Sequence, residues 1–411
     1  MDRVFELIEL EEKRQRETIN LIPSENYVSR AVLEALGSCL VNKYAEGYPD
    51  KRYYQGNLII DEVENLAIER AKKLFLVPHA NVQPYSGSPA NQAVYMACCN
   101  LGDTVMGMDL SAGGHLTHGS RVSFSGKYYR PVFYSVEEQT GRIDYNLVLA
   151  IAQKEKPKLI WVGATAYPRF FDWEECHKIA LSVGAYLVAD ISHYAGLVAG
   201  GVYPSPVPFV DIVTSTTHKT LRGPRGAIIL VTDQGLQKDQ ELAKKIDKAV
   251  FPGLQGGPHE NAIAAIAVCL AEAATDEFKQ YVKQVVINSA VLAEELKKNG
   301  FNLVSGGTDN HLVLIDLRNK NILGKEAAVA LEKAGIICNA NSIPFDPNPP
   351  MNPSGIRLGT PAITTRGMKE PEMKEVAFLI SRVIDNFSDG EILQEILQKV
   401  KLLTARFPIN R

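Results

Sequence analysis

The chain is poor in the residues that mark several protein classes. Only six of its 411 residues are cysteine, and none of them lies in a C-x-x-C motif. This argues against a disulfide framework and predicts reduced thiols. No run of about 18 apolar residues occurs, and the N-terminal segment lacks the apolar stretch of a signal peptide. We therefore expect a cytoplasmic protein with no membrane span and no metal centre.

The chain also has no large excess of acidic or of basic residues. The net charge is -3, and no long basic run occurs. The sequence thus has no electrostatic footprint for nucleic acid or for an anionic membrane surface. A hydrophobic content of 45% is instead typical of a globular protein with a large core. This composition favours chemistry on small molecules.

Short apolar runs alternate with helical segments between about residues 56 and 275, which is typical of a mostly parallel α/β sheet. The predicted strands include TVMGMDL, KLIWVGA, AYLVADI, DIVTSTT and GAIILVT. After a long helical stretch (259–300), the strand NHLVLIDL, the helix GKEAAVALEKAG, the short strand IICNA and helices from about 369 predict a smaller α+β domain. We expect an N-terminal helical arm and interface segment (1–55), a large domain (56–275) and a small domain (276–411).

Reactive side chains follow three of the predicted strands. Asp190 ends one strand, and Lys219 lies in a polar turn between two apolar runs. Ser86 and Gly87 follow another run, and Pro89 is predicted at the first position of a helix. Ligands of open α/β sheets bind at such strand ends. Each residue alone also has an ordinary interpretation as a helix cap, a satisfied polar group or a capped turn.

The combination of these residues is more specific. A strand-end lysine, a strand-end carboxylate and a phosphate cradle at a helix N-terminus are the anchors that pyridoxal 5'-phosphate needs. Lys219 would form the Schiff base, Asp190 would keep the pyridine nitrogen protonated, and the turn at Ser86 would hold the phosphate. A lysine condensed with an aldehyde is no longer a free ammonium, so it can lie between two buried strands.

The segment STTHKTLRGPRG (215–226) resembles the cofactor-lysine segment of serine hydroxymethyltransferases. The resemblance covers nearly the whole chain, through the segments LIPSENYVS, NKYAEGYPDKRYYQG, NVQPYSGSPANQAVY, GGHLTHGS, FSGKYY, GATAYPR, DISHYAGLVA, VFPGLQGGP and SGIRLGTPAITTRG. It implies the α/β fold of pyridoxal-phosphate-dependent transferases (fold type I, aspartate aminotransferase-like). This fold has a large domain with a mostly parallel seven-stranded sheet and a smaller C-terminal α+β domain.

The resemblance also implies roles in a cofactor site. Lys219 would carry pyridoxal 5'-phosphate covalently, Asp190 would bind the pyridine nitrogen, and His115 would stack on the ring. His193 would bind the phenolic oxygen of the ring. The other cofactor contacts would come from Ser86, Gly87, Thr165 and His218 of the same chain and from Tyr44, Gly256 and Gly257 of a second chain.

Further roles concern the substrates. Arg357 would hold the serine carboxylate through a bidentate pair. Glu46 of the neighbouring subunit would be the acid/base residue beside the hydroxymethyl group, with Tyr54 next to it. Ser24 would also contact the amino acid, and tetrahydrofolate would contact Leu110, Gly114, Leu116, Asn341 and Met351. Residues that serve the other subunit imply a homodimer with shared active sites.

The implied reaction is the reversible conversion of L-serine and tetrahydrofolate to glycine and 5,10-methylenetetrahydrofolate, through an external aldimine and a glycine quinonoid. Two other activities stay open at this point: a folate-independent aldolase for threonine and other β-hydroxy amino acids, and an α-methylserine hydroxymethyltransferase. A non-catalytic scaffold protein would have lost the reactive residues. Lys219, Asp190, His115, Glu46 and Arg357 are all present.

The sequence departs from the common family pattern at several positions. Pro89 replaces a common Gln, Tyr85 a His, Thr165 a Ser and Ser192 an Ala. The segment GGPHENAIAAIAV replaces the common GGPLMHVIAAKAV, so His259, Glu260 and Asn261 are unusual. No group essential to the chemistry is lost. We expect effects on affinity or substrate choice and none on the class of reaction.

Overall fold

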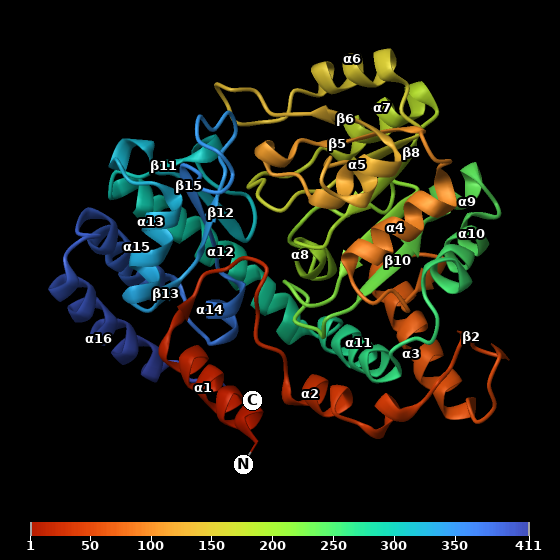
Figure 1. Cartoon of the computed structure of the whole chain (residues 1–411), viewed down its shortest axis with the longest axis horizontal. Coiled ribbons are helices and arrows are strands. Elements are labelled where there is room, and N and C mark those ends of the chain that lie inside the picture. The colour runs from red at the N-terminus through yellow and green to blue at the C-terminus, as the bar shows by residue number, and fades with distance from the viewer. Residues whose placement is uncertain (1, 410–411) are drawn as a thin grey trace.

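The computed structural model describes residues 2–409. The chain forms a larger part, coloured mainly orange to green in Figure 1, and a smaller part, coloured mainly blue, against which the red N-terminal helix lies. The long helix α12 (Asp276–Lys298) connects them. None of the helices in residues 2–409 is both long and apolar enough to cross a membrane.

Seven strands form the central sheet of the larger part, in the order β4-β10-β9-β8-β7-β5-β6. Neighbouring strands are parallel except around β10, which runs antiparallel to β4 and β9. This confirms the predicted mostly parallel seven-stranded sheet. The strands are β4 (His79–Asn81), β5 (Thr104–Met108), β6 (Arg130–Tyr134), β7 (Leu159–Val162), β8 (Tyr186–Asp190), β9 (Ile212–Thr216) and β10 (Ala227–Val231).

Helices cover both faces of this sheet, because successive strand residues point to opposite faces and both sets are apolar. Trp161 and Ile229 pack in one core with α4 and α10, whereas Met106 and Leu230 pack in another with α3 and α11. The helices of the larger part are α2 (Arg30–Leu36), α3 (Leu58–Phe75), α4 (Gly87–Cys98), α5 (Phe124–Tyr128), α6 (Tyr145–Glu155), α7 (Trp173–Val183), α8 (Ala195–Ala199), α9 (Asp233–Lys238), α10 (Leu242–Lys248) and α11 (Glu260–Ala273).

The smaller part contains an antiparallel four-stranded sheet with helices packed against it, and the sequence predicts its α+β class. The strand order is β11-β12-β15-β14. Its strands are β11 (Asn302–Leu303), β12 (Leu312–Asp316), β14 (Asn339–Asn341) and β15 (Gly355–Gly359). Its helices are α13 (Gly324–Lys333), α14 (Pro361–Thr365), α15 (Glu370–Asp385) and α16 (Gly390–Arg406).

The N-terminal segment joins the smaller part before it reaches the larger one. Helix α1 (Arg3–Glu17) buries no residue of its own. It leads into β1 (Ile19–Asn20), which pairs in parallel with β13 (Ile336–Ile337). Ile19 is fully buried in the core of the smaller part. Residues 1–55 therefore contribute to that core, and the division of the chain at residues 55 and 275 stays a prediction.

The helical stretch predicted for 259–300 contains two helices, α11 and α12, because the side chain of Thr275 accepts from the backbone N–H of Phe278 and caps α12. The helical position predicted for Pro89 was wrong. Pro89 lies at the third position of α4, which begins at Gly87. Proline is tolerated there because the N–H groups of a first helical turn have no helical partner.

Candidate active site

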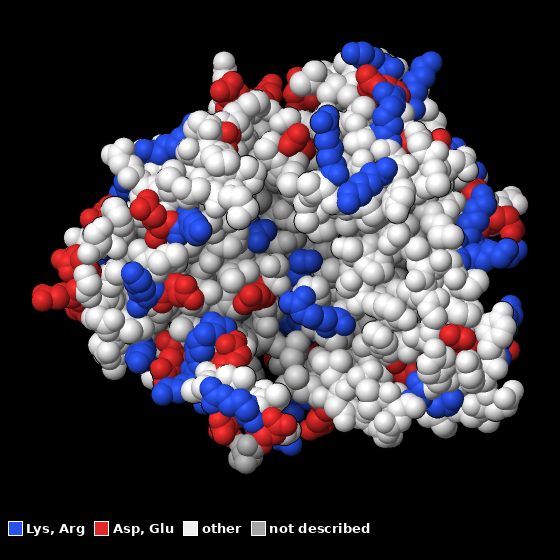
Figure 2. Space-filling model, in the orientation of Figure 1, with Lys and Arg blue, Asp and Glu red and all other residues white. Residues whose placement is uncertain are grey.

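A cavity of about 470 Å³ lies at the ends of β8 and β9 and is lined by residues of both parts of the chain. Figure 2 shows a hollow between the two parts, with Lys and Arg atoms beside it. Among the residues predicted for the site, the cavity is lined by Ser24, Ser86, Gly87, Leu110, Gly114, His115, Leu116, Thr165, Asp190, His193, His218, Lys219, Asn341 and Arg357. Residues separated by more than 300 positions are thus brought to one site.

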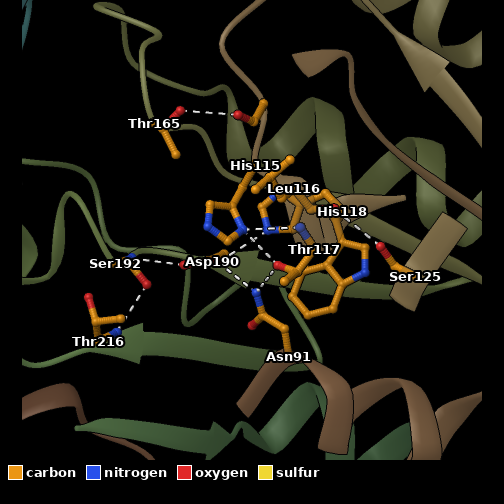
Figure 3. A network of polar contacts seen from close by, with 12 residues as sticks. Asn91, His115, Leu116, Thr117, His118, Ser125, Thr165, Asp190, Ser192 and Thr216 are labelled. Atoms are coloured by element: carbon orange, nitrogen blue, oxygen red, sulfur yellow. Dashed lines mark hydrogen bonds and ion pairs between the residues drawn. The ribbon is translucent and has the colours of Figure 1, made fainter. Parts of the chain in front are cut away.

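Asp190, the last residue of β8, is held by three hydrogen bonds (Figure 3). Its Oδ2 accepts from Asn91 Nδ2 at 2.9 Å and from His118 Nε2 at 3.1 Å, and its Oδ1 accepts from the backbone N–H of Ser192 at 3.0 Å. Burial alone would raise the pKa of Asp190, but the hydrogen bond and charge of His118 outweigh it and keep this pKa well below its ordinary value. Asp190 is therefore an ionised carboxylate that can bind a protonated group.

His115 is fixed by its neighbour Thr117. The backbone N–H of Thr117 donates to His115 Nδ1 at 3.2 Å, so this nitrogen is an acceptor. The Thr117 hydroxyl therefore donates to the same nitrogen at 2.7 Å, while its oxygen accepts from Asn91 at 2.8 Å. Burial, helped by the nearby His118, lowers the pKa of His115 to about 4. The ring is neutral, with its proton on Nε2.

His115, His118 and Asp190 also form the one group within residues 2–409 whose ligand atoms could share a metal ion, because these atoms lie within 4.8 Å of one another. The hydrogen bonds described above already account for this arrangement. We expect Asp190 to bind an organic cation.

Lys219 lies in the turn between the antiparallel strands β9 and β10, at the cavity. Its Nζ donates to the hydroxyl of Thr216 at 2.8 Å. Burial lowers the pKa of Lys219 to about 8, and the charges of Arg357 and Arg225 act in the same direction, against the attraction of Asp190. The uncharged amine, which is the nucleophilic form, is therefore much more populated near neutral pH than it is in an ordinary lysine.

The start of helix α4 can hold a phosphate group. Ser86 occupies the N-cap position without using its side chain to cap the helix, so its hydroxyl is available to a ligand. A side chain at Gly87 is excluded, because a Cβ atom there would lie 2.8 Å from Cγ2 of Thr216. The buried Nδ1 of His218 has no hydrogen-bond partner in the described residues. Together with Lys219 and Asp190, this end of the cavity fits pyridoxal 5'-phosphate.

Arg357, on β15, brings a partly buried positive charge to the opposite side of the site. It donates from Nη1 to the carbonyl of Thr165 at 2.5 Å and from Nε to Asn339 Oδ1 at 3.1 Å. No carboxylate within residues 2–409 forms an ion pair with it, and its Nη2 makes no hydrogen bond there. Burial lowers the pKa of Arg357 to about 10. The cation is thus available to the carboxylate of a ligand.

Five predicted residues gather away from the cavity: Tyr44, Glu46, Tyr54, Gly256 and Gly257. The hydroxyl of Tyr44 donates to Glu46 Oε1 at 3.4 Å, and its ring lies edge-on to that of Tyr54 at 5.1 Å. A Cβ at Gly256 would lie 3.0 Å from Glu46 Oε1, and one at Gly257 would lie 3.2 Å from Tyr44 Cζ. The two tyrosines are 54% and 46% exposed. We call these residues the exchange cluster.

Met351, which is 84% exposed, also lies outside the cavity lining.

A buried arginine fixes the backbone on both sides of Glu46. Arg52 donates from Nη1 to the carbonyls of Ala45 and Gly47, at 2.8 and 2.9 Å. Its Nη2 forms an ion pair with Glu64 at 2.6 Å, and the two side chains are 3% and 1% exposed. The position of Glu46 is therefore determined by the protein interior, although Glu46 itself lies near the surface.

The prediction from sequence missed several supporting residues. Asn91, Thr117, His118 and Thr216 hold the predicted catalytic side chains in place. His118 lies in the segment GGHLTHGS, which carried the resemblance, and Asn91 is a buried amide in an apolar helix. The motif that contains His118 and the amide in an apolar helix at Asn91 could each have marked these residues as part of the site. The partner that each of them binds could be found only in three dimensions.

Comparisons with known proteins show the family of the chain. The model of a family described as serine hydroxymethyltransferase matches residues 1–380. The chain is 57% identical over 405 residues to a serine hydroxymethyltransferase of Desulfotalea psychrophila, with 98% of this chain and 93% of that protein covered. It is 56% identical over 411 residues to a serine hydroxymethyltransferase of Acidothermus cellulolyticus, with 98% and 95% covered.

Proposed function

Because the chain belongs to the serine hydroxymethyltransferase family, we propose that it interconverts serine and glycine. L-serine and tetrahydrofolate would give glycine and 5,10-methylenetetrahydrofolate, reversibly. The observation that carries the proposal is Arg357, a partly buried cation that has no counter-ion in residues 2–409 and lies in a cavity that also holds Lys219 and Asp190. An amino acid carboxylate is the anion that suits this position.

Pyridoxal 5'-phosphate is the cofactor that we propose for the site. When bound, it supplies an electron-accepting ring that stabilises negative charge at the α-carbon of an amino acid. Lys219 would hold it covalently, Asp190 would keep a proton on the facing ring nitrogen, and Ser86, Gly87 and His218 would bind its phosphate. His115, Thr165 and His193 would make the remaining contacts from this chain.

Other residues of this chain would bind the substrate, move a proton and stabilise charge. Arg357 binds the substrate carboxylate and thereby sets which bond of the α-carbon faces the ring. Ser24 lines the same cavity and can bind the amino acid. Glu46 moves the proton of the hydroxymethyl oxygen, with Tyr54 beside it. Asp190 holds the proton of the facing ring nitrogen, and the positive charge of that proton favours the negative charge that develops during the reaction.

We infer that tetrahydrofolate binds at the opening of the same cavity. Leu110 and Leu116 line the cavity and are 44% and 45% exposed, so they offer apolar contacts to a flat ring at the opening. Gly114 and Asn341 also line it and can contribute polar groups. A contact from Met351 stays a prediction.

We further infer a homodimer in which each exchange cluster completes the site of the other chain. The exposure of Tyr44 and Tyr54 supports this inference. So do the apolar residues Leu58 and Ile59 on the neighbouring helix α3, which are 82% and 64% exposed. The cytoplasmic location stays a prediction.

Absorbance spectra test the proposal. Purified protein should show the visible band of lysine-bound pyridoxal 5'-phosphate, and Lys219→Ala should lose that band. Glycine with tetrahydrofolate should produce a new long-wavelength band that glycine alone produces only weakly. Glu46→Gln should keep the cofactor band, because the role proposed for Glu46 is at the hydroxymethyl oxygen of the substrate and not at the cofactor. A cofactor band that tetrahydrofolate leaves unchanged would refute the folate-dependent reaction.

A further inference from the structure

Two buried histidines meet where the larger and the smaller part join. His193 follows β8, and His311 directly precedes β12. Nδ1 of His193 lies 3.3 Å from Nε2 of His311, and the rings are stacked with centroids 5.5 Å apart. Their exposed fractions are 3% and 0%. His311 lines no part of the cavity, so any effect on a ligand must pass through His193.

Both imidazoles are neutral. Burial lowers the pKa of His193 well below its ordinary value and the pKa of His311 to about 3. The positive charges of Lys219 and Arg357 act in the same direction on both rings. A neutral imidazole has one donor and one acceptor nitrogen, so one ring must donate to the other in this contact.

The direction of this hydrogen bond follows from the remaining nitrogen of His311. Its Nδ1 is buried and has no hydrogen-bond partner in the described residues. A buried N–H without a partner is rarer in proteins than an acceptor with an unused lone pair. The proton of His311 is therefore on Nε2, which donates to Nδ1 of His193. The proton of His193 must then be on its own Nε2.

His311 is also held rigidly. Its backbone carbonyl accepts from the N–H of Thr360 at 3.1 Å. The preceding residue, Asn310, donates from its side chain to the carbonyl of Tyr167 at 3.2 Å and accepts from the N–H of Leu312 at 3.0 Å. The ring of Tyr194 lies edge-on to that of His311, with centroids 5.9 Å apart. His311 is thus anchored to both parts of the chain.

We propose that His311 is a positioning residue that fixes the tautomer of His193, so that the Nε2–H of His193 is the donor offered to a ligand oxygen in the cavity. This inference rests on the proposed function, in which that oxygen is the phenolic oxygen of the cofactor. It gives the smaller part an influence on the cofactor site that acts through His193, besides the contact of Arg357. A ligand oxygen that carries negative charge gains most from such a donor.

The tautomers can be measured directly by ¹⁵N NMR of histidine-labelled full-length protein, with and without pyridoxal 5'-phosphate. Protonated and bare ring nitrogens have distinct shifts. Spectra of His193→Asn and His311→Gln assign the two rings. We expect both rings to carry the proton on Nε2, and in His311→Leu we expect the His193 signals to move toward a mixture of tautomers. A proton on Nδ1 of His193 in the wild type would overturn the inference.

Cofactor binding provides the functional readout. His311→Leu removes the donor, whereas His311→Gln keeps an N–H group and serves as the conservative variant. We expect pyridoxal 5'-phosphate to bind about tenfold more weakly to the Leu variant and within about threefold of wild type to the Gln variant. The absorbance maximum of the bound cofactor should shift in the Leu variant only. Equal binding and equal spectra in the two variants would contradict the role. A wild-type protein that binds no cofactor would refute the proposed function. The tautomers of His193 and His311 could still be measured in the cofactor-free protein.

Discussion

Arg52 and Glu64 form a 2.6 Å ion pair inside the protein, directly beneath the segment that carries Glu46. The arginine uses its other donors on the two carbonyls that flank Glu46 and on Asp61. Gln83 completes the arrangement by donating to both Gly47 and Glu64. A residue proposed to act in the other chain is thus positioned by the core of its own.

The first prediction concerns this ion pair. Arg52→Lys keeps the charge but cannot reach two carbonyls and two carboxylates at once. We expect kcat for serine cleavage to fall at least about tenfold, because Glu46 loses its fixed position. The cofactor absorbance should stay close to that of wild type. Arg30→Lys is the matched control, since Arg30 lies on the surface of α2 and its one ion pair within residues 2–409 is with Glu34. A variant with the kcat of wild type would show that Arg52 does not position Glu46.

A second prediction concerns stability and pH. Glu260 is 1% exposed, and neither of its carboxylate oxygens has a partner in residues 2–409. Burial, followed by repulsion from Glu64, raises the pKa of Glu260 from 4.5 to about 8. A carboxyl group with a raised pKa in the folded state costs stability as pH rises from about 4.5 to about 8. Glu260→Gln should therefore unfold several degrees higher than wild type at pH 8.5 and near the same temperature at pH 5.

Calorimetry at the two pH values checks this prediction, with Glu34→Gln as the control for an exposed carboxylate. An equal gain at both pH values would mean that packing, and not ionisation, is responsible. A loss at pH 8.5 would mean that Glu260 has a partner when the chain is assembled.

The third prediction uses the pKa of Lys219, which is lowered to about 8. Only the neutral amine attacks an aldehyde, so the rate at which cofactor-free protein takes up pyridoxal 5'-phosphate should rise with pH through a midpoint near 8. Arg357→Leu removes a repelling charge and should move the midpoint to higher pH. Stopped-flow absorbance measures both. A midpoint near 10.5 in wild type would show that the cavity does not lower the pKa of Lys219.

Tyr85 provides a fourth prediction, because its ring stacks on His259 with centroids 4.2 Å apart and its hydroxyl donates to the carbonyl of Gly257 at 2.7 Å. Both residues depart from the common family pattern. Tyr85→Phe keeps the stack and loses only the hydrogen bond. We expect the cofactor to bind about fivefold more weakly, because Gly257 would serve the phosphate in the other chain. Tyr128→Phe, at an exposed position, is the control. Unchanged binding would show that the turn at Gly257 does not contribute to cofactor binding.

Much of this architecture could be predicted from the sequence, for physical reasons. The central strands are buried on both faces, so they appear as continuous apolar runs, and Asp190 and Lys219 follow them at positions where ligands bind. The pairing of β1 with β13 was not predictable, because two-residue strands have no periodicity. The hydrogen bonds of Asp190 were missed because Asn91 and His118 come from separate elements and meet only in the folded chain.

The most direct test of the account is to incubate the protein with L-serine and tetrahydrofolate and to measure glycine and 5,10-methylenetetrahydrofolate together. Wild type should give equal amounts of the two products, and Lys219→Ala should give none. Arg357→Lys should lower kcat/KM for serine by about a hundredfold or more, because it loses the bidentate contact. Serine cleavage at the same rate with and without tetrahydrofolate, or no glycine at all from cofactor-loaded protein, would contradict the account.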